Sequence, residues 1–124
     1  MGGLYYLTTD EIDIKGNKLY LIEGKHSANS KLPSLGDIKD GLLKMILYCN
    51  LTNTYIGDIS YTVIPTLKLT SSSLTGKLTS NDSEENKQLF FKNNMLNNSQ
   101  IEIVKTLINE SQTNNFEIII QGEW

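Results

Sequence analysis

The sequence has no arginine, and it has only one alanine, one cysteine and one histidine among its 124 residues. All 11 positive charges are lysines, and the formal net charge of −3 gives no general attraction to a phosphate polymer. Any nucleic-acid surface must therefore be a local patch. The single cysteine, Cys49, has no partner within the chain for a disulfide, which is typical of a protein in a reducing compartment.

Long apolar runs are also absent. No segment approaches the roughly 20 apolar residues that a membrane-spanning helix requires, and no basic stretch followed by an apolar signal core opens the chain. We therefore expect a cytoplasmic protein that contacts no membrane. Apolar residues make up 39% of the chain, which suits a globular fold, and the length suits one core. Residues 1–124 are accordingly expected to form a single domain.

A β-hairpin is the strongest local pattern in the sequence. The stretch "YYLTTDEIDIKGNKLYLIEGKHS" contains two segments of strand-like composition on either side of "KGNK". Gly16-Asn17 is a two-residue turn signal, because glycine accepts the positive φ that a type II′ turn needs at its first central position. We predict that residues of about 9–15 and 18–26 pair as antiparallel strands.

The length of this turn decides which side chains share a face. With a two-residue loop, Ile14 faces Leu19 and Asp10 faces Glu23 at the far end of the hairpin. A loop one residue longer would instead bring Glu11 and Asp13 to that face. Both registers are open at this point.

The stretch "LPSLGDIKDGLLKMILYCN" changes to helical spacing. Ser34 and Asp37 form a cap-like pair, so the helix is expected to cover about residues 35–49. Its predicted sheet-facing residues are Ile38, Leu42, Met45 and Ile46, and its predicted outward residues are Asp37, Lys39, Asp40 and Lys44.

The second half of the chain continues with strands and helices. "YIGDISYTVIPTLKLTS" has a strand composition, and Pro65 within it predicts a bulge, a break or an edge position. Helices are expected at about 83–96 and 99–111, the second with a cap-like pair at Ser99 and Glu102. The apolar run "FEIIIQ" is typical of a buried strand. The predicted fold class is α/β, with a mixed central sheet flanked by helices.

Glu23 and Lys25 are the pair that suggests chemistry. Residues i and i+2 of a strand point to the same side, so this carboxylate and this ammonium share a face with Asp10 in the shorter-loop register. Two carboxylates can hold a hard divalent ion such as Mg²⁺, and a lysine beside it can orient or help to deprotonate an attacking water. The backbone carbonyl of Gly24 lies between the two side chains and offers a further oxygen.

These residues also carry a resemblance to a known family. Asp10, an Ile-rich strand, a short turn and "LYLIEGK" resemble the D…(D/E)xK signature of the PD-(D/E)xK nuclease superfamily. "EGKHS", followed closely by "LPSLGDIKDGLLKMILYCNL", is similar to bacterial type II restriction endonucleases. The resemblance covers about residues 8–52. It implies a restriction-endonuclease-like core and a divalent-metal-dependent endonuclease that acts on double-stranded DNA.

Carried over to this chain, the resemblance implies that Asp10 or Asp13 binds the metal together with Glu23. The cofactor would be Mg²⁺, with Mn²⁺ as a substitute, and Lys25 would lie beside the nucleophilic water. Asp10 has the better turn parity, whereas Asp13 sits in "EID", which also resembles family members.

The chain departs from the family at its start. The family core begins with a helix before the hairpin, and at most nine residues precede Asp10 here. Three explanations follow: the sequence is a fragment or domain of a longer enzyme, a partner chain or second copy supplies the missing helix, or the core is degenerate. The last explanation favours a different class of function, a non-catalytic DNA-binding or dimerisation module that keeps a nuclease-like fold.

Simpler roles compete for each of these residues. Glu23 and Lys25 could be an exposed ion pair at a strand end, which contributes little to stability. His26 alternates away from Lys25, which favours a surface or packing role, and Cys49 is best interpreted as buried filler.

Overall fold

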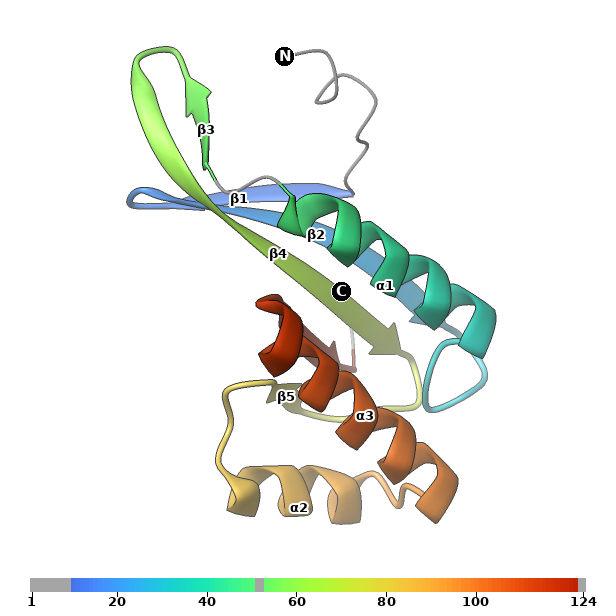
Figure 1. Cartoon of the computed structure of the whole chain (residues 1–124). Helices are drawn as coiled ribbons and strands as arrows, with labels where there is room; N and C mark the ends of the chain where they lie inside the picture. The colour runs from blue at the N-terminus through green and yellow to red at the C-terminus, as the bar shows by residue number, and fades with distance from the viewer. Residues whose placement is uncertain (1–9, 51–52, 123–124) are drawn as a thin grey trace.

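The computed structural model describes residues 10–50 and 53–122 (Figure 1). This part of the chain contains six strands and three helices. In chain order they are β1 (Glu11–Lys15), β2 (Lys18–Ser27), α1 (Leu35–Cys49), β3 (Asn53–Ile56), β4 (Ile59–Ser71), β5 (Lys77–Thr79), α2 (Glu84–Asn93), α3 (Asn98–Asn114) and β6 (Glu117–Gln121).

The described strands form one mixed sheet. Adjacent strands follow the order β1-β2-β4-β6-β5, and β3 pairs with the first residues of β4. The three central strands, β2, β4 and β6, are parallel, whereas β1 and β5 are antiparallel to their neighbours. Figure 1 shows α1 and α3 lying on the same side of this sheet. The prediction of an α/β fold with a mixed sheet flanked by helices is therefore confirmed.

The hairpin has the shorter of the two expected loops. Lys15 lies opposite Lys18, and Ile12 lies opposite Leu21, so only two residues form the turn. Gly16 has a φ of +62°, as the first central position of a type II′ turn requires. The expected start of the first strand, at residue 9, lies outside the described residues.

Pro65 interrupts no strand. It lies within β4 and pairs in register with Leu21 of β2. On the other side of β4, the ladder with β3 ends at Thr62 and the ladder with β6 begins at Thr66. Pro65 therefore falls where the described part of the sheet pairs with β4 on one side only, which fits the expected edge position and corrects the alternatives of a bulge or a break.

Helix α1 starts where the sequence predicted, but its buried face is different. Ser34 caps it by accepting a hydrogen bond from the Asp37 backbone, and Ile38 and Met45 are buried as expected. The prediction for Ile46 was wrong, since this side chain is 57% exposed. Leu42 is half-buried, and the remaining sheet-facing positions are Gly41 and Tyr48.

Gly41 explains this setting of the helix. A Cβ atom at this position would lie 2.5 Å from Cδ1 of Leu67, a fully buried residue of β4. The missing side chain lets α1 approach the sheet closely at this point. In the resulting rotation of the helix, Asp40 and Lys44 face β2, whereas the sequence predicted both residues on the outward face. Leu43 and Ile46 face solvent instead.

Helix α3 begins earlier than predicted. Asn97 is its N-cap and forms a reciprocal capping box with Gln100, so the cap-like pair Ser99 and Glu102 does not start the helix. Asn115 ends it in a left-handed conformation, as the sequence indicated. No helix among the described residues is both long enough and apolar enough to cross a membrane.

The buried apolar side chains form one cluster between the sheet and the helices. The fully buried members come mainly from β4, β6, α1 and α3: Leu67, Leu69, Ile118, Ile120, Met45, Tyr48 and Val104. Glu23 lies at the border of this cluster, between β2 and α1.

Candidate functional site

Glu23 and Lys25 point to the same side of β2, beneath α1. The Nζ atom of Lys25 lies 3.6 Å from Oε2 of Glu23. Glu23 is only 5% exposed, which is unusual for a carboxylate and requires charged or polar partners. The structure thus brings together the acid and the lysine that the sequence singled out, and it buries the acid more deeply than an exposed ion pair would be.

Helix α1 supplies the other partners of Glu23. Tyr48 donates a long hydrogen bond of 3.5 Å to Oε1, and the Nζ atom of Lys44 lies 4.0 Å from the same oxygen. Lys25 approaches the other oxygen, so each carboxylate oxygen has its own cationic neighbour. This arrangement offsets the cost of burying the carboxylate.

Lys25 has a second and closer partner in Asp40. Its Nζ atom lies 2.7 Å from Oδ2 of Asp40 and donates a hydrogen bond to it. This hydrogen bond is the main reason why the pKa of Lys25 is raised and the pKa of Asp40 is lowered. Lys25 therefore stays an ammonium ion at neutral pH, and it is better suited to orient a water or stabilise an anion than to remove a proton.

Asp10 lies at the end of the hairpin, next to Gly24. Its carboxylate accepts a 2.8 Å hydrogen bond from the Gly24 backbone, and its own backbone N–H donates to the carbonyl of Ile22. In an antiparallel pair the N–H and C=O groups of one residue point to the same neighbouring strand. The carbonyl of Gly24 therefore faces the same side as Asp10, just beyond the end of β1.

Asp13 is placed apart from this group. It pairs with Tyr20, whose side chain lies on the opposite face of the sheet from Glu23. Its carboxylate lies 3.6 Å from Nζ of Lys15 instead. The hydrogen bond between Asp10 and Gly24, the residue after Glu23, therefore favours Asp10 over Asp13 as the carboxylate nearer the candidate site.

The donor set near β2 fits Mg²⁺ in kind, because carboxylate and carbonyl oxygens are the ligands that this ion prefers. Asp10, Glu23 and the carbonyl of Gly24 would be the protein ligands. Within residues 10–50 and 53–122, no cluster of three or more acidic, histidine or cysteine side chains is arranged to hold a metal. Any ion bound here would keep several water ligands and would compete with Lys25 and Lys44 for Glu23.

Sequence reasoning missed the contribution of α1. Asp40, Lys44 and Tyr48 are spaced four residues apart, so they form one stripe along the helix. This spacing was visible in the sequence. The neighbouring leucines and isoleucines obscure it, because they favour a different buried face.

The other reactive side chains lie elsewhere. His26 is exposed on the face opposite Lys25, with Nδ1 2.6 Å from the hydroxyl of Thr70. Cys49 is half-buried at the end of α1, and this burial raises the pKa of its thiol. The placement of His26 agrees with the surface role expected from the sequence, whereas Cys49 is less buried than expected.

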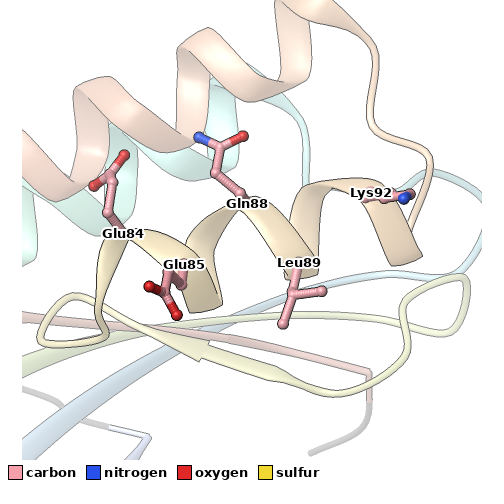
Figure 2. A pocket seen from close by; sticks show the side chains of 5 residues that line it. All are labelled: Glu84, Glu85, Gln88, Leu89 and Lys92. Atoms are coloured by element: carbon pink, nitrogen blue, oxygen red, sulfur yellow. The ribbon is translucent and has the colours of Figure 1, made fainter.

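A hollow of about 470 Å³ lies beside α2, away from the Glu23 group (Figure 2). Figure 2 shows that all of its labelled side chains belong to this one helix. They are Glu84, Glu85, Gln88, Leu89 and Lys92. A surface formed by a single helix face has no convergent polar groups, so it is a weaker candidate for a site than the Glu23 group.

Comparisons of the chain with protein-family models, with curated proteins and with solved structures find no match.

Proposed function

We propose that this chain carries the core of a divalent-metal-dependent endonuclease that hydrolyses phosphodiester bonds in double-stranded DNA. The single observation that supports the proposal is the contact between Glu23 and Lys25 beneath α1, with Asp10 accepting a hydrogen bond from the backbone of Gly24, the residue between them. Helix α1 follows β2 and leads to β4, which is parallel to β2. This order of acid, strand, turn, acid-x-lysine strand and helix is the one on which the resemblance to PD-(D/E)xK nucleases rests.

Each residue has a distinct role in this proposal. Asp10, Glu23 and the Gly24 carbonyl hold Mg²⁺, with Mn²⁺ as a substitute, and the bound ion supplies charge stabilisation at the phosphoryl group. Lys25 remains protonated and orients the attacking water or stabilises the developing negative charge. Asp40 fixes the position of this ammonium group from the helix side.

Metal binding can be tested without any cleavage. Titration of the chain with Mg²⁺ or Mn²⁺, followed by NMR, should shift the Asp10, Glu23 and Gly24 signals together, with a dissociation constant of about 1 mM because many water ligands remain. Glu23→Gln should abolish these shifts. Glu102→Gln, which changes an exposed carboxylate on α3, is the matched control and should leave them intact. Unchanged shifts in Glu23→Gln would show that the metal assignment is wrong.

Cleavage tests the role of Lys25. The longest natural version of the chain should nick a mixed-sequence plasmid in the presence of Mg²⁺ or Mn²⁺. Lys25→Ala should remove most of this activity and leave the fold intact, whereas Lys105→Ala, at an exposed position on α3, should not. Metal-dependent nicking that survives unchanged in Lys25→Ala would contradict the role given to this residue.

One observation favours the second candidate, a non-catalytic DNA-binding or dimerisation module. Lys25 and Lys44 form ion pairs with the Glu23 and Asp40 carboxylates within the protein itself, as in a structural ion-pair network. Such a module would show no metal-dependent shifts at Glu23 and no nicking by the verified full-length protein. In that case Lys25→Ala would reduce DNA affinity by about one phosphate contact and would lower the salt dependence to match.

A further inference from the structure

Strand β1 forms a border of the described sheet. It pairs with β2 on one side, and the order β1-β2-β4-β6-β5 places no other described strand beside it (Figure 1). Its sequence is Glu-Ile-Asp-Ile-Lys, from Glu11 to Lys15. Border strands of this kind can pair with another chain, because their outward N–H and C=O groups offer a ready template.

The hairpin determines which backbone groups point outward. Lys15 and Lys18 flank the two-residue turn and therefore form a hydrogen-bonded pair, so the even-numbered residues of β2 face β1. Asp10, whose N–H also donates to the Ile22 carbonyl, lies outside this regular register. Ile22 pairs with Glu11, which therefore faces β2 in return. By alternation, the N–H and C=O groups of Ile12 and Ile14 point away from the hairpin.

The same two residues expose apolar side chains. Ile12 is 56% exposed and Ile14 is 46% exposed, although they lie opposite the buried residues Leu21 and Leu19. Two half-exposed isoleucines on a short border strand form an apolar strip that continues the core-facing side of the hairpin.

We propose that β1 pairs with the β1 strand of a second copy of this chain, antiparallel and with the two-fold axis at Asp13. In this register Ile12 of each copy lies opposite Ile14 of the other. The two outward-facing residues of each strand then exchange both of their backbone hydrogen bonds, which gives four bonds from two pairs. The four isoleucine side chains meet on one face of the joined sheet.

Charge complementarity selects the partner and the register. Glu11 of each copy lies opposite Lys15 of the other, which gives two symmetric ion pairs on the other face. Only Asp13 meets its own equivalent, and Lys15 of the same chain lies 3.6 Å from this carboxylate. The interface is therefore self-complementary at four of its five positions in each strand.

The neighbouring registers are less favourable. A shift of two residues in one direction places Glu11 opposite Asp13 of the second copy, which opposes like charges twice. A shift in the other direction places Ile12 opposite Gly16, whose φ of +62° belongs to the turn and cannot continue a strand. A shift of one residue would pair outward-facing groups with inward-facing ones.

A charge exchange tests the pairing in solution. The wild-type chain is expected to be a dimer by sedimentation equilibrium. Glu11→Lys and Lys15→Glu should each weaken it about tenfold, because each converts two attractive pairs into repulsive ones. An equimolar mixture of these two variants should recover association, since their charges are complementary again. Circular dichroism would verify that both variants are folded.

A disulfide test identifies the register. In a Cys49→Ser background, Asp13→Cys should cross-link two chains under mild oxidation, because the two residues face each other across the axis at a distance that a disulfide can span. Ile14→Cys is the matched control and should not cross-link, since Ile14 faces Ile12 of the other copy. A monomeric wild type, a mixture that fails to associate, or cross-linking of Ile14→Cys in preference to Asp13→Cys would overturn the proposal. It stands independently of the proposed nuclease activity.

Discussion

The ammonium group of Lys25, on β2, lies 2.7 Å from the carboxylate of Asp40, on α1, and this ion pair ties the helix to the sheet beside Glu23. The pair has two consequences. It keeps Lys25 charged, and it fixes the ammonium group on the side of Glu23 that Lys44 and Tyr48 do not occupy. Helix α1 is thus the element that positions the candidate site, and the hairpin supplies the groups that it positions.

Replacing Asp40 by Asn should lower the pKa of Lys25 towards its ordinary value of 10.5, because the hydrogen bond to Asp40 is the largest cause of the upward shift. An NMR titration of the Lys25 Cε signal would measure this change. Asp58→Asn, at the exposed turn between β3 and β4, is the control and should leave the Lys25 titration unchanged. An unaltered Lys25 pKa in Asp40→Asn would contradict the ion pair.

The same ion pair predicts how stability depends on pH. The lowered pKa of Asp40 means that its contribution is present above the ordinary carboxyl value of 3.8 and is lost as the pH falls through the lower folded-state pKa. The raised pKa of Lys25 means that its contribution is present below 10.5 and is lost as the pH rises through the higher folded-state pKa. The unfolding free energies of wild type and Asp40→Asn, measured with denaturant, should therefore differ most between pH 3.8 and 10.5. They should converge below the folded-state pKa of Asp40 and above that of Lys25.

Much of the fold followed from short-range patterns in the sequence. The turn at Gly16-Asn17 fixed the register of the hairpin, and the serine at position 34 marked the start of α1. These features depend on a few adjacent residues, so local stereochemistry decides them. The cap at Asn97 was missed because Ser99 and Glu102 offer a similar pattern two residues later.

The rotation of α1 could not be obtained in the same way. The helix has more apolar residues than its buried face can hold, and Leu43 and Ile46 remain more than half exposed. The close contact between Gly41 and Leu67 selects the buried face, and this contact joins residues that are far apart in the sequence. Asp40 and Lys44 reach the site only because of that choice, so local spacing did not identify them.

A pair of glycine variants tests this contact. Gly41→Ala should destabilise the protein by about 1 kcal/mol, because its Cβ would press on the buried Leu67 side chain and this overpacking exceeds the gain in helix propensity. Gly36→Ala, whose nearest neighbour is Ser34 Oγ at 3.9 Å, should instead stabilise it by roughly 0.5–1 kcal/mol. Urea unfolding measures both changes. Equal effects of the two variants would argue against close packing at Gly41.

Asn94 should be among the most sensitive polar residues outside the site. It is 2% exposed, and its side chain accepts hydrogen bonds from the backbone N–H and the hydroxyl of Thr75 and donates to the carbonyls of Thr75 and Phe90. Asn94→Ala would leave several of these groups without a partner, so we expect a loss of about 2–3 kcal/mol in unfolding free energy. Asn93→Ala, at an exposed neighbouring position, should change stability by less than about 0.5 kcal/mol.

The last prediction tests the rotation of α1 through two adjacent residues with opposite environments. Met45 is fully buried, so Met45→Ala should cost about 2–5 kcal/mol through lost contacts and the cavity that remains. Ile46 is 57% exposed, so Ile46→Lys should change stability by less than about 0.5 kcal/mol. If Ile46 faced the sheet, as its spacing from Leu42 suggested, Ile46→Lys would instead bury a charge and unfold the protein. Thermal and urea unfolding of the two variants distinguish these two rotations of α1. Only the rotation seen in the structure directs Asp40 and Lys44 towards Lys25 and Glu23.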